Sequence, residues 1–167
     1  MRAITLTQPW ATLVAVGAKR IETRGWSTRY RGMLAIHAAK TMPREARELC
    51  YEVPFLEVLN THNLRPGTLP RGHVIAVAEL VGVMPTEVNG YMPPALVARM
   101  TAMEQAFGHY GPGRMAWILA NVRGLKTPIY ARGALGLWEW APPADLDELL
   151  EPVVPAASYQ QATEVGA

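Results

Sequence analysis

At 167 residues the chain has the length of one domain, and half of its residues are hydrophobic, which is enough for a single buried core. Cys50 is the only cysteine, so the composition excludes a disulfide framework and a thiolate zinc site. The net charge of +2 is unevenly distributed: residues 1–141 hold all sixteen basic and nine acidic residues, and the remainder holds five acidic residues. The first 141 residues therefore carry +7, and a basic domain of this kind attracts polyanions.

Neither a membrane span nor a secretion signal is expected. No window approaches the ~18 to 20 apolar residues that cross a bilayer. The start of the chain, MRAITLTQPW, lacks the apolar run of a signal peptide. We therefore expect a soluble protein with no membrane partner, located in the reducing environment of the cytoplasm.

The first quarter of the chain predicts a strand, a short helix and two further strands. Residues 2–8 alternate apolar and polar side chains as a strand does. Pro9 suits the first position of a helix, and Gly17 suits its end. Residues 20–26 alternate again, so this strand should have an apolar face and a charged face. Residues 32–40 form a strand that is too apolar to be exposed on both faces.

Strands and helices do not alternate regularly in the rest of the chain, so a doubly wound parallel sheet is not expected. The order of elements predicts an α+β fold, in which a mixed or antiparallel sheet curls into a small barrel with helices at its ends. In chain order we expect a helical region over 43–60, a loop over 61–72, a buried strand over 73–83, a helix over 93–109, strands over 115–122, 125–131 and 135–140, and a short acidic helix over 144–150.

Several common active-site motifs are absent from the sequence. The chain has no phosphate-loop lysine motif, no dinucleotide-binding glycine fingerprint and no glycine-flanked nucleophilic serine. Its four histidines show no metal-ligand spacing and have no cysteine nearby, so neither a metal site nor a cofactor is predicted. His37 lies within an apolar strand, where we expect a hydrogen-bonded core histidine.

The most basic segment, Lys19–Arg31, contains a single acid. Glu22 and Arg24 share the charged face of the predicted strand, and Lys19 can fold over its edge. Two interpretations are open at this point. The three side chains could meet in a cleft where the carboxylate and the guanidinium tune a lysine general base. Alternatively, they form a surface ion-pair ladder worth less than ~1 kcal/mol per pair.

Aromatic residues within the same segment indicate nucleic-acid binding. Trp26 and Tyr30 lie beside Arg29 and Arg31 in the sequence. An aromatic plane can stack a base while neighbouring guanidinium groups hold phosphates. This combination predicts a surface that binds a single strand.

A glycine-rich bend further along the chain carries Tyr110 and Arg114. One hydroxyl and one guanidinium would suit the lip of a pocket, although turn chemistry alone accounts for the glycines. Trp10 and Trp117 are expected in the core.

The N-terminal segment resembles a known family. The stretch LTQPWATLVAVGAKRIETRGWSTRYRGMLAIHAAK is similar to the opening of an ASCH (activating signal cointegrator homology) domain, whose members share Q-P-W-A, G-x-K-x-x-E-x-R and Y-R-G-x-L-x-I-H-A motifs. The stretches FGHYGPGRMAWILANVRGLKTPI and GALGLWEW resemble the second half of longer bacterial members. The similarity covers residues 3–141, so we expect an ASCH domain over residues 1–141 and an acidic C-terminal extension over residues 142–167.

The resemblance implies a PUA-like fold, a small mixed β-barrel with flanking helices, and a cleft associated with RNA or modified nucleosides. By position, it implies that Lys19, Glu22 and Arg24 line this cleft. Gln8 and Trp10 would lie at the helix that opens it, with Tyr30 and Arg31 at its rim. The expected partner is therefore RNA or a modified nucleoside, bound through nine residues: Gln8, Trp10, Arg24, Trp26, Arg29, Tyr30, Arg31, Tyr110 and Arg114.

The resemblance also implies an enzymatic alternative. Short bacterial relatives are similar to acetylcytidine amidohydrolases, which use a lysine, a threonine three residues later and a distant glutamate. Lys19 matches the lysine, Glu22 occupies the threonine position, and Thr23 should face the opposite way. The alternative is a hydrolase acting on RNA or modified nucleosides, either amidohydrolase or ribonuclease, in which Glu22 activates water and Lys19 stabilises an oxyanion. Glu104 is a candidate for the distant acid.

The acidic extension gives a third alternative, a protein-interaction module whose segment Asp145–Glu151 controls access to the basic face. Deleting residues 142–167 without any change in nucleic-acid affinity would exclude it.

Overall fold

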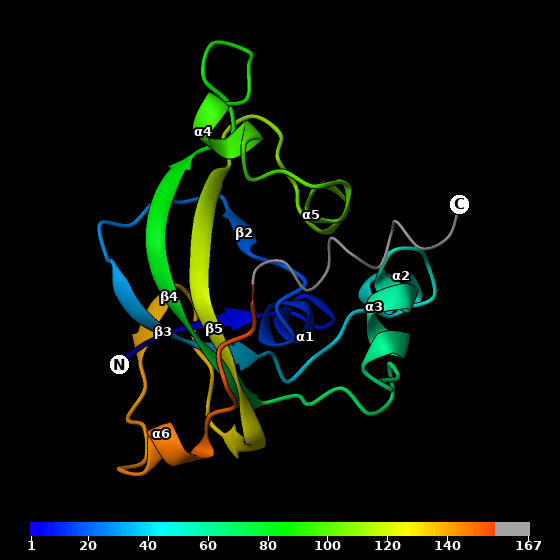
Figure 1. The fold of residues 1–167 in the computed structure, drawn as a ribbon, viewed down its shortest axis with the longest axis vertical. Coiled ribbons are helices and arrows are strands. Elements are labelled where there is room, and N and C mark those ends of the chain that lie inside the picture. Colours follow the sequence, from blue (N-terminus) through cyan, green and yellow to red (C-terminus); the bar gives the residue numbers. More distant parts are fainter. Residues whose placement is uncertain (156–167) are drawn as a thin grey trace.

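The computed structural model describes residues 1–155, which form one sheet and a set of short helices (Figure 1). In chain order the elements are β1 (Arg2–Leu6), α1 (Trp10–Ala15), β2 (Ile21–Arg24), β3 (Gly32–Ala38), α2 (Arg44–Leu49), α3 (Phe55–Thr61), β4 (His73–Pro85), α4 (Pro94–Val97), α5 (Ala102–Phe107), β5 (Met115–Tyr130), β6 (Leu137–Glu139) and α6 (Leu146–Leu149).

The sheet is mixed, with the strand order β2-β5-β4-β3-β1-β6. Its pairs are antiparallel except for β1 and β3, which run parallel. β4 and β5 are long, and three shifts of register between them bend both strands, as β-bulges do. Figure 1 shows the two strands curving side by side along the molecule, which makes the sheet a half-barrel with helices beside it. The α+β class and the mixed, curved sheet predicted from the sequence are therefore confirmed.

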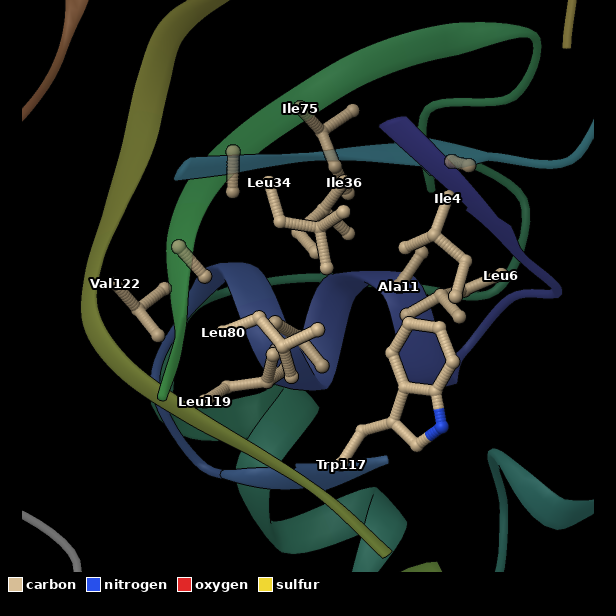
Figure 2. Close-up of a cluster of buried hydrophobic side chains, with 14 residues drawn as sticks. Ile4, Leu6, Ala11, Leu34, Ile36, Ile75, Leu80, Trp117, Leu119 and Val122 are labelled. Atoms are coloured by element: carbon tan, nitrogen blue, oxygen red, sulfur yellow. The ribbon is translucent and has the colours of Figure 1, made fainter. Parts of the chain in front are cut away.

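The main core lies between the concave face of the sheet and α1. Figure 2 shows apolar side chains from four strands gathered around this helix. The predicted end of α1 is confirmed: Gly17 has a φ of +78°, a conformation that other residues adopt only with strain. The labelled members of the cluster are Ile4, Leu6, Ala11, Leu34, Ile36, Ile75, Leu80, Trp117, Leu119 and Val122.

The single helix predicted over residues 93–109 is wrong, because two short helices, α4 and α5, stand there. The break falls at Thr101, whose backbone is extended. Its hydroxyl accepts a hydrogen bond from the backbone N–H of Glu104 at 3.0 Å and so caps α5. A local bond of this kind competes with continued helix and starts a new one instead.

The two strands predicted over 115–122 and 125–131 form the single strand β5. Asn121 has a φ of +49°, and the register with β4 shifts near this point, yet the pairing continues to Tyr130. The irregular residues between the two apolar runs are therefore a bulged part of one strand rather than a turn.

Residues 142–155 pack along the outer side of β5. Leu150 is buried at 4 % exposure and bridges to Leu125. The backbone N–H groups of Glu151 and Val154 donate to Gly124 (2.8 Å) and Val122 (2.9 Å). The domain boundary after residue 141 stays a prediction, and residues 156–167 of the acidic extension lie outside the described part of the chain.

Within residues 1–155, every helix is too short or too polar to cross a bilayer.

Candidate functional site

The strand β2 has the two faces that its sequence predicts. Ile21 and Thr23 are buried, whereas the side chains of Glu22 and Arg24 are 13 % and 25 % exposed. Arg24 Nε lies 3.3 Å from Glu22 Oε1, and Arg24 Nη2 donates to the Thr5 carbonyl at 2.6 Å. Burial lowers the pKa of Arg24, and the Arg114 charge adds to this effect, while the Glu22 carboxylate opposes it. Glu22 is thus held in a partly enclosed, positively charged setting.

Lys19 pairs with Glu104 of helix α5, whereas Glu22 pairs with Arg24. The Lys19 side chain is 1 % exposed, and Nζ donates to the Ile21 carbonyl. The nearest carboxylate is that of Glu104, whose Oε1 lies 3.6 Å from Nζ. The Lys19 ammonium group therefore interacts with groups in the protein interior.

Glu104 ties α5 to β2. Its two carboxylate oxygens accept hydrogen bonds from the backbone N–H groups of Arg20 (2.8 Å) and Ile21 (3.1 Å). Burial raises the pKa of Glu104, and the charge of Lys19 together with the two N–H groups opposes that rise. Because every oxygen has a partner, we assign Lys19 and Glu104 the structural task of positioning α5.

A cleft of about 290 Å³ opens between β2, the N-terminus of α1, α3 and the C-terminal end of α5. Its wall is aromatic: the rings of Trp10 and Phe55 meet edge to face at 6.1 Å, and those of Phe55 and Phe107 at 4.9 Å. Trp10 Nε1 donates to the Phe107 carbonyl at 2.8 Å, which fixes the indole. The lining residues are Trp10, Glu22, Thr23, Leu49, Phe55, Ala106, Phe107, Gly108, His109 and Arg114.

Arg114 provides the positive charge of the cleft. Its Nη2 donates to the Thr23 carbonyl at 2.8 Å, which holds the side chain against β2. Its Nε is buried and has no hydrogen-bond partner among the described residues. Glu22 and Arg114 therefore give one cleft both an acceptor and a donor of opposite charge.

Tyr110 stands behind the wall of the cleft. Its ring packs so closely on Gly108 that a Cβ there would come within 2.4 Å of it. Burial raises the pKa of the hydroxyl, and the carboxylates of Glu104 and Glu22 raise it further. Within residues 1–155 this buried hydroxyl makes no hydrogen bond of standard geometry, and the Glu104 carboxylate is the acceptor that interacts with it. Of the two residues predicted in the bend, Arg114 lines the cleft and Tyr110 supports it.

Gln8 is fully buried. Its Nε2 donates to the Pro70 carbonyl at 2.7 Å, and its Oε1 accepts from the Thr12 N–H at 3.1 Å. These two bonds fix the start of α1 against the loop before β4.

Four predicted binding residues lie on the loop between β2 and β3 and are not among the residues that line the cleft. Trp26 is 36 % exposed, and its ring meets Trp117 edge to face at 4.7 Å. The Tyr30 hydroxyl donates to the Met33 carbonyl, and Arg31 Nη1 donates to the Thr28 carbonyl at 3.0 Å. Arg29 is exposed. The loop thus presents one indole and two guanidinium groups outside the cleft.

The aromatic wall was not predicted from the sequence. Phe55 and Phe107 are the only phenylalanines of the chain, and each occupies an apolar helical position typical of a core residue. No pattern near either residue indicates that they meet beside Glu22. His37, by contrast, is the hydrogen-bonded core histidine that was predicted, with contacts to Thr5 Oγ1 at 3.2 Å and to the Ala131 carbonyl at 3.0 Å.

Among residues 1–155 no three histidine, cysteine or acidic side chains are grouped so that they could share a metal ion.

The structure is a mixed half-barrel with helices beside it and a cleft next to the second strand. The sequence profile of the ASCH domain matches residues 4–129, and the chain belongs to the ASCH family. The ASCH domain is a PUA-like fold associated with RNA binding.

Two similar proteins agree with this assignment. A crystal structure of ASCH from Zymomonas mobilis superposes with a TM-score of 0.50 at 16 % identity, covering 91 % of this chain and 96 % of that one, and so supports the fold. Human activating signal cointegrator 1 is 46 % identical over 48 residues, which are 28 % of this chain. The match covers only 8 % of the human protein's length.

Proposed function

We propose that the chain binds single-stranded RNA or a modified nucleoside and holds one base in the cleft beside Glu22. The observation that carries this proposal is the meeting of a carboxylate, a guanidinium and an aromatic wall in one cleft of about 290 Å³. Aromatic faces stack bases, while polar groups at fixed positions select them. The charge of +7 on residues 1–141 favours a polyanionic partner.

The two charged groups of the cleft have complementary tasks. Glu22 accepts hydrogen bonds from the amino edge of a base, and its ion pair with Arg24 fixes the carboxylate. Arg114 donates to a base carbonyl or to the adjacent phosphate. Trp10, which is half-buried, supplies the stacking face, and the buried rings of Phe55 and Phe107 hold it in place. Trp26, Arg29 and Arg31 lie on the neighbouring loop and contact flanking nucleotides.

The surroundings of Lys19 favour binding over hydrolysis. A general base or oxyanion-stabilising group must reach the reacting atoms. The Lys19 amine is 1 % exposed and is engaged by the Ile21 carbonyl and by Glu104, and Lys19 is not among the residues lining the cleft. This placement of Lys19 favours binding. Hydrolysis with Lys19 and Glu22 at its centre is the alternative, and a second measurement tests it.

Titration calorimetry with cytidine and N4-acetylcytidine tests the proposal. Replacing Glu22 by the isosteric glutamine removes one charged hydrogen bond, worth about 1.5–3 kcal/mol, and should weaken binding about 10- to 150-fold. Glu139→Gln is the matched control, because that carboxylate pairs with Arg2 on an exposed edge of the sheet. Equal affinities for wild type and Glu22→Gln would contradict the proposal.

The same solutions, analysed for released acetate and deacetylated cytidine, test the alternative. Turnover by the wild type that is lost in Glu22→Gln, and in Lys19→Ala while circular dichroism shows that this variant is folded, would establish a hydrolase. Binding without turnover would exclude the hydrolase and support a binding module.

A further inference from the structure

The far end of β5, opposite the end that pairs with β2, brings three separate parts of the chain together. The Gly72 N–H donates to the Ala38 carbonyl at 2.8 Å, and the Ala131 N–H donates to the Gly72 carbonyl at 3.2 Å. Lys40 lies over Gly72, its Cβ 3.9 Å from the place where a Cβ on Gly72 would stand. The ends of β3 and β5 and the start of β4 thus form one surface.

This surface is rich in positive charge. The segments that meet here, 38–44, 71–78 and 126–132, contain no acidic residue and hold five basic ones. Lys40, Arg71 and Arg132 are exposed here, and none of them forms an ion pair with another described residue. The nearest acidic element along β5 is α6, whose Asp147 is paired with Arg123. The three cations are therefore free to meet an anionic partner.

An exposed aromatic ring belongs to the same surface, because Tyr130 pairs with His73 where β5 ends and β4 begins. Tyr130 is 76 % exposed, and its ring meets the ring of His73 edge to face at 5.8 Å and 81°. The imidazole contact orients the phenol ring, and most of the Tyr130 surface stays accessible to solvent. A cationic surface with an oriented, exposed aromatic ring is the arrangement that binds single-stranded nucleic acid without sequence preference. We name Lys40, Arg71, His73, Tyr130 and Arg132 the distal basic patch.

We propose that the distal basic patch is a second contact site for single-stranded RNA, in which Lys40, Arg71 and Arg132 hold phosphates and one base stacks on Tyr130. The inference rests on the proposed function, because it extends the same RNA beyond the base in the cleft. β5 has 16 residues and spans at most about 50 Å at ~3.3 Å per residue. A strand of about 15 nucleotides at ~3.4 Å each covers that length, whereas four nucleotides do not.

Fluorescence anisotropy with oligocytidylates of 4 and 16 nucleotides tests the proposal. Tyr130→Ala should weaken binding of the 16-mer about 5- to 150-fold and leave the 4-mer unchanged, and Tyr130→Phe should retain most of the affinity. The double variant Arg71→Gln/Arg132→Gln should reduce the slope of log affinity against log salt for the 16-mer by about 1.4, since each phosphate contact on a single strand contributes about 0.7.

Matched controls lie elsewhere on the surface. Tyr91 is 80 % exposed on the loop before α4, so Tyr91→Ala removes an equally exposed ring. Arg47→Gln/Arg99→Gln removes two exposed guanidinium groups outside the patch that likewise form no ion pair with a described residue. Both controls should bind the 16-mer within twofold of the wild type after correction for net charge.

The outcomes separate this inference from the proposed function. If Glu22→Gln weakens both oligonucleotides but the patch variants match their controls, the distal site is overturned and the cleft stands. If the patch variants weaken the 16-mer while Glu22→Gln changes nothing, the distal site stands and the cleft is overturned. Patch variants that lose binding to phosphatidylserine vesicles but keep the 16-mer affinity would overturn the assignment of RNA as the partner.

Discussion

The pair of Lys19 and Glu104 is the most consequential charge interaction at the residue scale. Both side chains are at least 95 % buried, and the two charges interact with each other and with backbone groups. Removing one partner leaves an uncompensated charge in a low-dielectric interior, which typically costs about 3–5 kcal/mol. We therefore expect Lys19→Met to lower the free energy of unfolding, measured in urea, by about that amount.

The double variant Lys19→Met/Glu104→Gln is the control for this prediction. Replacing both charges removes the desolvation cost together with the attraction. The loss of stability in the double variant should therefore be smaller than the sum of the losses in Lys19→Met and Glu104→Gln. Additive losses would mean that the two groups do not act as a pair.

Tyr110 predicts a pH dependence of stability. The pKa of its hydroxyl is raised above the ordinary value of about 10, so in alkali the unfolded chain loses this proton first. Proton loss from the unfolded state alone lowers stability, and the loss begins as the pH rises through about 10. Tyr110→Phe should stay within about 1 kcal/mol of the wild type at pH 8, because the hydroxyl makes no hydrogen bond of standard geometry with a described residue. Between pH 8 and 10.5 the variant should lose less stability in urea titrations; equal losses would contradict the prediction.

At the scale of elements, α5 is the part of the fold on which the cleft depends. The helix carries Glu104 at its start and Phe107 at its end, and its first turn is capped by Thr101. Thr101→Ala removes the cap and should cost about 0.5–2 kcal/mol of stability. Thr101→Ser keeps the hydroxyl and should cost only a small fraction of the stability that Thr101→Ala loses. A thermal melt of the three proteins measures the difference, and equal losses for alanine and serine would show that the hydroxyl does not cap α5.

The same element explains how far the site could be predicted from the sequence. The two faces of β2 follow from the alternation of apolar and charged side chains along the strand, which can be read from the local sequence. This part of the prediction is confirmed. Glu104 was a candidate for the distant acid of a Lys19-centred site by resemblance alone. The residues themselves did not place it beside Lys19, because Glu104 reaches β2 only after the helix predicted over 93–109 breaks at Thr101. That break depends on the capping hydrogen bond of the Thr101 hydroxyl. The apolar residues on both sides follow a helical period, so their pattern alone predicts one continuous helix. Contacts between distant segments have no such local signal, so the aromatic wall was also missed.

At the scale of the whole molecule, the protein separates its charges. The basic residues lie before residue 142, and the acids of α6 pack on β5, where Arg123 Nη1 lies 3.2 Å from Asp147 and Lys126 Nζ donates to the Glu148 carbonyl at 2.8 Å. The carboxylate of Asp147 is 93 % exposed, so this contact contributes little to stability. Its larger effect is on the electrostatic field along β5, which links the cleft to the distal basic patch.

Neutralising α6 should therefore strengthen RNA binding without weakening the fold. In Asp147→Asn/Glu148→Gln two negative charges are removed beside β5, and we expect severalfold tighter binding of a 16-nucleotide RNA at ~50 mM salt. The gain should vanish near 1 M salt, where the screening length falls to about 3 Å. Glu45→Gln/Glu52→Gln neutralises two exposed acids in and just after α2 and is the control of equal charge change. If both pairs raise the affinity equally, only net charge matters; an advantage for the α6 variant means that RNA passes along β5.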